Sequence, residues 1–497
     1  MKYNNPIIRG FNPDPSICKV DENYYLTTSS FEYFPGIPIY HSTDLVNWKQ
    51  IGNCITRSSQ LSLKGANDSG GIWAPMICYW EGAFYVTASL DGRGNFILST
   101  KDIYGEWSNP VWVPMGGIDP SLYFEEDRVY YCTNQSLQPG QEQITMAQID
   151  ILTGRLVSEI RMLWTGTGGG FLEAPHLYWI GDWYYLMTAE GGTNFNHMVT
   201  IARSKKLWGS YESCPDNPIL SNRHDTSKEV QCTGHGDLVQ DGNGNWWMLH
   251  LGTRLSRRTM THLGRETFLT PVEWRNEWPV VENGRKARLI VEGPLWEEQK
   301  EKRSFSADFN REVWEPEWIF LRKPDFSFYC RREGKLMMKP SSNIEDRQSS
   351  PSFAAVRQSD FECRVETGLN FNPVEEGDEA GLLIYLSSDF YYRFGKKRVG
   401  GENYLMIEKK AEDFQQTACQ IKIKEGHLRL VIEADEKAYH FYYALEDEPV
   451  QYGGTASTRF LSCELAGKCF TGTVIGIYAL CSQGTKTVAE FDEFAMR

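Results

Sequence analysis

A pattern repeated over the first 300 residues constrains the fold of this chain more than any other feature. Pairs of neighbouring aromatic residues stand in five short strand-like runs. These pairs are Tyr24-Tyr25, Phe84-Tyr85, Tyr130-Tyr131, Tyr184-Tyr185 and Trp246-Trp247. Each pair follows a turn that contains acidic residues, glycine or both, and each turn follows another short apolar run. Five such units, with periods of roughly 46 to 62 residues, are typical of a β-propeller.

One position recurs in these units, 10 or 11 residues before the first aromatic of the pair. The residues at this position are Asp14, Trp73, Asp119, Glu173 and His235. Because the innermost strands of a propeller converge on its central axis, residues at one repeated position face one another there. The repeat therefore predicts that three carboxylates and a histidine, which are far apart in the sequence, meet in one site.

Three inward carboxylates and a histidine allow two chemical interpretations. A calcium cage would need six to eight oxygen ligands, often crowded within one loop, and no loop in this sequence resembles an EF-hand. Hydrolysis of a glycosidic bond needs a protonated carboxylic acid that helps the leaving oxygen depart. It also needs an ionised carboxylate that activates water or attacks C1.

The local sequences suggest a role for each carboxylate. Glu173 follows the run GTGGGFL and precedes an Ala-Pro pair, and such apolar surroundings disfavour its charge and raise its pKa. A nearby ionised Asp119 would act in the same direction, so we predict that Glu173 is the general acid and that Asp119 holds it and tunes its pKa. Asp14 lies between two prolines, on rigid backbone, and is the predicted general base.

The composition narrows the class of partner. Aromatic residues make up 13% of the chain, which suits surfaces that stack on sugars, although core packing is their commoner use. The net charge of −14 argues against nucleic acid, which needs a basic face. A small oligosaccharide is the partner that we expect.

Further sequence features bear on the compartment. The chain has no apolar run of 18 residues, so we predict no membrane contact. Its first residues show no apolar signal-peptide core, which predicts a cytoplasmic protein. The twelve cysteines show no Cys-x-x-Cys spacing and are interpreted as reduced thiols.

The pattern changes near residue 292. A charged, glycine-free segment over 297–303 predicts a connector, and alternating runs such as GLLIYLSS and QIKIKEGHLRLVIEA follow it. Such alternation is typical of an antiparallel β-sandwich. We therefore predict a propeller domain over 1–296 and a sandwich domain over 304–497. Two roles are open for the sandwich: a carbohydrate-binding module, or a structural lid that shapes the pocket or an oligomer contact. The short connector favours tight packing, and a homo-oligomer is compatible with the sequence.

Several motifs stand in a fixed order between residues 5 and 281. They are NPIIRGFNPDPSI, SGGIWAP, GIDPSLYF, EAPHLY, AEGGTNFNHMVTIARS, TGHGDLV and HLGRETFLTPVEW. Together they resemble glycoside hydrolase family 43, in the group of β-xylosidases and α-L-arabinofuranosidases that carry a C-terminal β-sandwich. The resemblance implies an all-β chain, with a five-bladed β-propeller followed by a concanavalin-like β-sandwich.

The resemblance also implies roles that agree with those from the local sequences. Asp14 is then the general base, Asp119 the pKa modulator and orienter, and Glu173 the general acid. The family inverts the anomeric centre, and we expect the carboxyl groups of base and acid to be about 6.5–9.5 Å apart, with a water between base and sugar.

Substrate contacts are implied motif by motif. Arg265 of GRET should reach sugar hydroxyls and the carboxylates, while Phe31 and Trp73 should form apolar walls of the subsite for the departing sugar. His235 matches a histidine near the channel axis, which in some relatives helps to hold a hydrated metal, often calcium. A plain hydrogen-bonding role is the other interpretation of His235. No cofactor is required on either interpretation, because a calcium ion there would be structural.

One departure from the family pattern is the sequence EAP, where EGP is usual. The methyl group of Ala174 is tolerated if the backbone angle φ is negative there, and it strains the position of Glu173 if φ is positive.

We therefore expect an exo-acting glycosidase that releases xylose from the non-reducing ends of β-1,4-xylo-oligosaccharides by a single-displacement, inverting acid–base mechanism. An α-L-arabinofuranosidase, or a bifunctional enzyme acting on arabinose side chains, is the close alternative. A non-catalytic sugar-binding propeller is a remote alternative, because such a protein would be expected to lack one of the three carboxylates.

Overall fold

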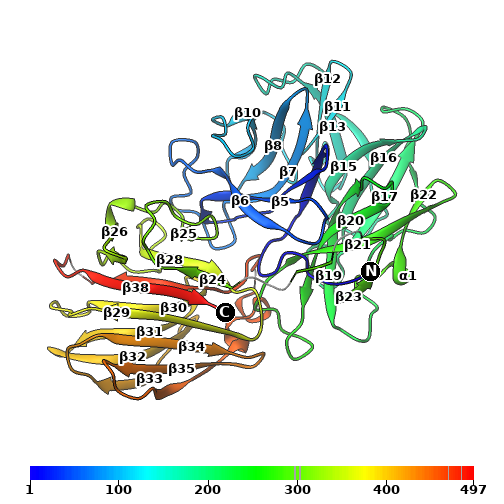
Figure 1. The fold of residues 1–497 in the computed structure, drawn as a ribbon. Helices are drawn as coiled ribbons and strands as arrows, with labels where there is room; N and C mark the ends of the chain where they lie inside the picture. Colours follow the sequence, from blue (N-terminus) through cyan, green and yellow to red (C-terminus); the bar gives the residue numbers. More distant parts are fainter. Residues whose placement is uncertain (296–297, 301–303, 468, 483) are drawn as a thin grey trace.

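Nearly all of the regular structure is β-strand. The computed structural model describes residues 1–295, 298–300, 304–467, 469–482 and 484–497, and in Figure 1 the strands drawn blue to green form one body while those drawn yellow to red form a second. The helical elements are single turns. They are α1 (Glu282–Arg285), α2 (Cys463–Ala466), η1 (Phe326–Phe328) and η2 (Thr458–Leu461). Within the described residues, no helix is long and apolar enough to cross a membrane.

Five four-stranded antiparallel sheets, counted over the described residues, follow one another along the first body. They confirm the predicted five-bladed β-propeller. Blade one is β2 (Ser16–Val20), β3 (Asn23–Thr27), β5 (Gly36–Ser42) and β6 (Lys49–Ile55). Blade two is β7 (Ile72–Trp80), β8 (Ala83–Leu90), β9 (Gly94–Thr100) and β10 (Val111–Val113). Blade three is β11 (Ser121–Glu125), β12 (Arg128–Thr133), β13 (Ile144–Ile149) and β14 (Arg161–Trp164).

The last two blades follow the same order. Blade four is β15 (Glu173–Ile180), β16 (Trp183–Glu190), β17 (Met198–Ser204) and β18 (Glu212–Ser213). Blade five is β19 (Val230–Gln240), β20 (Trp246–Arg254), β21 (Glu266–Arg275) and β22 (Trp278–Val281). Each aromatic pair of the sequence repeat lies on the second strand of its blade, where large side chains fill the space between neighbouring blades.

The ring closes where blade five packs on blade one. Ile17 and Tyr24 of blade one share a buried cluster with Val239 and Trp247 of blade five. A short two-stranded sheet lies beside this closure, formed by β1 (Lys2–Asn4) and β23 (Ile290–Glu292). The two ends of the propeller segment are therefore joined to each other before the chain enters the second body.

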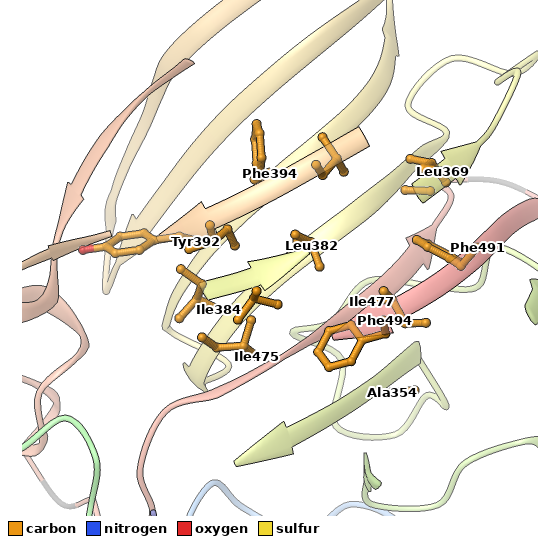
Figure 2. Close-up of a cluster of buried hydrophobic side chains, with 14 of the residues drawn as sticks. Ala354, Leu369, Leu382, Ile384, Tyr392, Phe394, Ile475, Ile477, Phe491 and Phe494 are labelled. Carbon is orange, nitrogen blue, oxygen red and sulfur yellow. The ribbon is translucent and has the colours of Figure 1, made fainter. Parts of the chain in front are cut away.

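The second body is the predicted β-sandwich, built from two sheets of eight strands within the described residues. One sheet holds β26 (Tyr329–Arg332), β27 (Lys335–Met338), β38 (Ala489–Met496), β29 (Cys363–Asn370), β34 (Leu428–Ala434), β35 (Ala438–Leu445) and β36 (Gln451–Ser457), with β24 (Phe305–Ala307) on β38. The other holds β33 (Phe414–Lys422), β32 (Glu402–Ala411), β31 (Phe390–Val399), β30 (Glu379–Ser387), β37 (Val474–Leu480), β28 (Ser352–Arg357), β25 (Ile319–Leu321) and β4 (Tyr33–Phe34). Figure 2 shows the core between them, in which Leu382 and Phe394 of one sheet lie near Leu369 and Phe491 of the other.

The two bodies share a sheet. Strand β4 belongs by sequence to the propeller segment, yet it pairs with β25 at the edge of the second sandwich sheet, with Phe34 opposite Phe320 and Tyr33 opposite Leu321. Of the predicted connector over 297–303, only residues 298–300 lie within the described part of the chain. The sandwich is thus tied to the propeller by backbone hydrogen bonds far from the connector.

Candidate active site

Every blade places a residue in the left-handed backbone region on its innermost strand or two residues before that strand begins. The angle φ is 56° at Asp14, 37° at Ala74, 51° at Asp119, 52° at Ala174 and 50° at His235. In blades two, four and five the pairing with the next strand shifts register at this place, which is the mark of a β-bulge. Because a bulge bends the strand and re-aims a side chain, this repeated distortion explains why residues of one sequence register meet.

Asp14 is held by three neighbours. Ser29 Oγ donates a hydrogen bond to its carboxylate at 2.5 Å, Arg265 lies 3.1 Å away, and His235 Nδ1 lies 3.5 Å away. Burial alone would raise the pKa of Asp14, but Arg265, His235 and the Ser29 hydroxyl outweigh it and hold the pKa below its ordinary value. The structure thus fixes Asp14 as an ionised carboxylate.

Glu173 has the opposite electrostatic character. Burial raises its pKa to about 7, with further contributions from the negative charges of Asp14 and Glu142, although Arg265 opposes the shift. A carboxyl group with this pKa carries a proton over much of the neutral range. Burial and the negative charge of Asp14 thus act on the pKa of Glu173 in the same direction.

The local sequences predict that Asp119 is an ionised neighbour of Glu173, and the structure differs from this prediction. Its own pKa is raised well above the ordinary value, first by complete burial and then by Glu173 and Asp14, while Arg265 and the backbone amide of Ala174 act against the shift. Two interacting buried carboxyl groups disfavour each other's charge. The raised pKa values therefore disfavour a state in which Asp119 and Glu173 are both ionised.

A second buried glutamate holds the loop that precedes Glu173. Glu190, which is 1% exposed, accepts hydrogen bonds from the backbone amides of Thr167 and Gly169 and from the hydroxyl of Thr200. A Cβ at Gly169 would lie 2.2 Å from the terminal methyl of Met198, so a larger residue there would require the flexible Met198 side chain to move. The sequence motif AEGG contains Glu190, but only its contacts reveal this anchoring role.

Arg265 joins the carboxylates to the sandwich. Besides Asp14 it donates to the Thr193 hydroxyl at 3.0 Å and to the backbone carbonyl of Phe470 at 3.2 Å. Its guanidinium lies 5.7 Å from the ring centroid of Phe31 and 5.4 Å from that of Phe470. Phe470 comes from the loop between α2 and β37, so the sandwich supplies one wall of this site.

The two predicted aromatic walls differ in how much surface they offer. Phe31 is only 2% exposed, because its ring packs against Arg265 and lies 6.4 Å from the ring of Phe470. Trp73 is partly exposed and donates its indole N–H to the carbonyl of Ser69 at 3.0 Å. Phe470, which no sequence repeat indicates, lies with Phe31 on the sandwich side of the site.

The histidines near the axis are uncharged at neutral pH. Burial lowers the pKa of His235 to about 4 and that of His197 to about 3. His235 Nδ1 lies 3.5 Å from Asp14 Oδ1. Because His235 is neutral, Arg265 is the principal positive charge beside the ionised Asp14.

Calcium held directly by the protein does not fit this place. No group of three or more His, Cys, Asp or Glu residues able to hold a metal ion occurs within the described residues. Asp237, the next carboxylate along the axis, already accepts hydrogen bonds from the Ser16 hydroxyl, the Ile17 amide and the Tyr178 hydroxyl. These donors leave few oxygen atoms for an ion that prefers six to eight.

Ala174, the alanine of the EAP motif, has a positive φ of 52°. Its backbone is therefore strained next to Glu173, as expected from the sequence for a positive φ. We expect Ala174→Gly to raise the free energy of unfolding by about 0.5–1 kcal/mol. The left-handed region costs a non-glycine residue about 1–2 kcal/mol. The greater backbone entropy that glycine loses on folding offsets about 0.5–1 kcal/mol of this gain. Thermal unfolding followed by calorimetry should show a melting temperature about 1–2 °C higher.

Ala88→Gly provides the matched control for this prediction. Ala88 is buried in β8, and its backbone angle φ is not positive. Glycine should therefore lower the free energy of unfolding there by about 1 kcal/mol. A lower melting temperature for both variants would show that the methyl of Ala174 is not strained.

Two family models match the chain. Glycosyl hydrolases family 43 matches residues 3–279, and the Beta xylosidase C-terminal Concanavalin A-like domain matches residues 306–497. Between them they cover both bodies of the structure.

Individual relatives match over nearly the whole length. The chain is 39% identical to a non-reducing end alpha-L-arabinofuranosidase of Bacteroides ovatus, over 100% of this chain and 94% of that protein. It is 33% identical to a xylosidase/arabinosidase of Humicola insolens, over 99% of this chain and 97% of that protein. The solved Bacteroides ovatus structure described as Xyloglucan PUL GH43B superposes with a TM-score of 0.95 at 38% identity, covering 100% of both chains.

Proposed function

Since the chain belongs to glycosyl hydrolases family 43 and is a glycosidase, we propose that it removes single pentose units from the non-reducing ends of short oligosaccharides. The first candidate substrate is a β-1,4-xylo-oligosaccharide, which yields xylose. The single observation that carries this proposal is the contrast between Asp14, held ionised by Arg265, and Glu173, whose pKa burial raises to about 7. One site then contains both a base and an acid.

Asp14 acts as the general base in this proposal. The hydrogen bond from Ser29 and the ion pair with Arg265 fix the carboxylate and keep it charged. It takes a proton from a water molecule as that water attacks the anomeric carbon from the face opposite the leaving group. Attack by water in a single displacement inverts the anomeric configuration.

Glu173 acts as the general acid, on the other side of the scissile bond. Its raised pKa keeps a proton available for the leaving oxygen near neutral pH. Asp119, whose own pKa is raised by burial and by Glu173, orients the acid and sets its proton affinity. Arg265 binds sugar hydroxyls beside Asp14, since its guanidinium is already held toward that carboxylate and the Thr193 hydroxyl.

The position of Phe470 supports an exo mode of action. Its ring lies near Phe31, its carbonyl accepts from Arg265, and its amide donates to the Ser69 hydroxyl at 2.9 Å. The sandwich loop is therefore fixed across one side of the site next to Asp14. A wall at this place suits a pocket for a terminal sugar better than a groove that a polymer passes through.

Arabinofuranose is the second candidate terminal sugar. The 39% identical relative is described as an alpha-L-arabinofuranosidase, and arabinofuranose can present its hydroxyls and scissile bond much as xylopyranose does. Initial rates on nitrophenyl β-D-xyloside and nitrophenyl α-L-arabinofuranoside decide between the two. We expect the xyloside to be hydrolysed; a xyloside rate at background with rapid arabinofuranoside hydrolysis would replace the first candidate with the second.

Inversion has its own test. Proton NMR recorded during hydrolysis of a β-xyloside should show α-xylose first, with β-xylose appearing later through mutarotation. If β-xylose forms first, a retaining mechanism operates and Asp14 is not a base acting through water.

The roles of Asp119 and Glu173 predict a specific pH effect. Asp119→Asn removes the carboxyl group whose charge competes with that of Glu173, so the basic limb of the kcat/KM profile, near pH 7 in the unaltered protein, should move to lower pH. An unchanged basic limb would show that Asp119 is uncharged while Glu173 titrates and would contradict its role as the pKa modulator. Asp150→Asn, on an exposed turn between β13 and β14, is the control and should leave the profile unchanged.

We also propose that turnover needs no bound metal, since side chains supply the general base, the general acid and the group that orients the acid. A hydrated calcium ion near His235 would be structural, and no step involves it. Dialysis against EDTA should leave kcat on the preferred nitrophenyl glycoside unchanged, and a loss restored by added calcium would contradict this.

A further inference from the structure

A second hollow lies at the other end of the propeller axis. It has a volume of about 660 Å³, which is within the range of about 300–1,000 Å³ usual for small-molecule sites. All five blades line it, mainly through the last residues of their innermost strands. These residues include Lys19, Trp80, Phe124, Trp179 and Gln240. Asp14, Asp119, Glu173 and His235 lie 5 or 6 positions before the named lining residue of the same inner segment, so the hollow and the candidate active site lie at opposite mouths of the ring.

The hollow is separated from the active site by a buried polar layer. Asp237, midway along β19, accepts hydrogen bonds from the Ser16 hydroxyl at 2.9 Å and the Tyr178 hydroxyl at 2.6 Å. His176 Nδ1 lies 3.6 Å from the same carboxylate. Because these groups are paired with one another across the axis, a ligand in the hollow does not reach Asp14 or Glu173.

The aromatic side chains around the hollow are exposed to an unusual degree. Trp179 is 50% exposed, and Trp80 and Trp246 are partly exposed. Within the described residues, none of these three indole N–H groups donates a hydrogen bond that the structure records. The Trp80 and Phe124 rings are nearly parallel, with centroids 5.3 Å apart. A core would cover such rings, so this arrangement has open apolar faces next to free donors.

The polar residues of the hollow narrow the ligand class. Lys19 supplies donors, Glu125 and Glu126 supply acceptors, and Gln240 supplies both. One positive and two negative side chains do not select an anion. Glu125 already accepts a hydrogen bond from the Tyr184 hydroxyl, and the Gln240 amide donates to the Gly244 carbonyl. The remaining donors and acceptors of these groups favour a ligand with hydroxyl groups over a purely apolar one. Flat aromatic faces combined with mixed donors and acceptors match a neutral pyranose chain, whose apolar faces stack on rings while its hydroxyls form hydrogen bonds.

We propose that this hollow is a second carbohydrate-binding site for a neutral, β-linked pyranose chain. It would hold such a chain on the face of the propeller opposite the active site, without taking part in hydrolysis. The choice of xylan as the probe rests on the proposed function, whereas the location of the site rests on the hollow alone.

Affinity electrophoresis of the full chain in native gels containing soluble neutral xylan tests the proposal. We expect the unaltered protein to be retarded, Trp179→Ala to bind at least tenfold more weakly, and Trp179→Phe to recover part of the binding. Tyr452→Ala is the matched control, because Tyr452 is 57% exposed on the sandwich strand β36; its retardation should equal that of the unaltered protein. Circular dichroism and melting temperature show whether each variant is folded.

Two outcomes would overturn the proposal. One is an absence of retardation, or retardation that Trp179→Ala does not change. The other is a dimer of the unaltered protein that Trp179→Ala converts to a monomer without any xylan binding, which would make the hollow an interface between copies. Turnover of both nitrophenyl glycosides is measured on the same samples. Retardation by xylan without turnover would contradict the proposed function and support the second binding site. Turnover without retardation would support the proposed function and contradict the second binding site.

Discussion

Glu173→Ala should lower kcat on unactivated xylobiose by about 10³- to 10⁴-fold, which corresponds to roughly 4–5.5 kcal/mol of transition-state free energy. The leaving sugar oxygen is a poor leaving group without a proton, and the buried Glu173, with a pKa of about 7, is the group that we propose supplies it. The measurement is the initial rate of xylose release, followed by chromatography.

The same variant should lose much less activity on nitrophenyl xyloside, roughly 10- to 100-fold, because nitrophenolate leaves without full protonation. Asp14→Ala is the companion variant. Its loss should be about equal on both substrates, since activation of the water does not depend on the leaving group. Equal losses for Glu173→Ala on the two substrates would contradict its role as the acid.

The pH profile should show the two groups separately. Glu173 must be protonated, so kcat/KM should fall as the pH rises above about 7. Asp14 must be ionised, and because Arg265, His235 and Ser29 hold its pKa below the ordinary value of 3.8, the acid limb should lie below that value. A basic limb that Glu173→Gln leaves in place on nitrophenyl xyloside would belong to another group.

The sequence repeat could predict the fold and the meeting of the carboxylates because both depend on one local rule. Each blade repeats the same strand order and a left-handed residue on or near its first strand, so register in the sequence translates into position in space. The repeat has a small irregularity that spacing alone does not reveal. Asp14, Asp119 and His235 are themselves the left-handed residues, whereas in blades two and four the left-handed residue is an alanine one position later, Ala74 or Ala174.

Three features of the site could not be predicted because they depend on contacts between distant segments. Phe470 lies about 200 residues beyond Arg265 and belongs to no repeat. Strand β4 is a two-residue segment whose partner is supplied by the sandwich. The raised pKa values of Asp119 and Glu173 depend on burial and on charges from distant segments, and neighbouring sequence letters report neither. Composition and local pattern indicate which residue types are present, and packing decides their charge.

Deletion of residues 304–497 should abolish soluble folding of the propeller. The cut removes β25, the partner of β4, and it uncovers a cluster in which Phe11, Phe31 and Tyr33 pack with sandwich residues such as Phe353 and Tyr385. A large apolar surface exposed in this way drives aggregation. The measurement is the soluble fraction after expression, with turnover of nitrophenyl xyloside as the functional readout.

A single substitution tests the same interface in the intact chain. Asp68 accepts hydrogen bonds from the side chains of Arg322 and Arg347, and the side chain of Arg322 is fully buried. Asp68→Ala leaves that guanidinium buried without its carboxylate, and breaking such a pair costs about 3–5 kcal/mol. We expect a clear fall in melting temperature.

Glu433→Ala is the control, because its ion pair with Arg364 lies on the sandwich surface, with side chains 44% and 39% exposed. An exposed pair contributes about 0–1 kcal/mol, so its loss should move the melting temperature little. A soluble and fully active propeller lacking residues 304–497, together with an Asp68→Ala variant as stable as Glu433→Ala, would show that the sandwich is an independent module. The shared sheet and the contact between Phe470 and Arg265 lead us to expect the opposite, because the active site is complete only when both bodies are present.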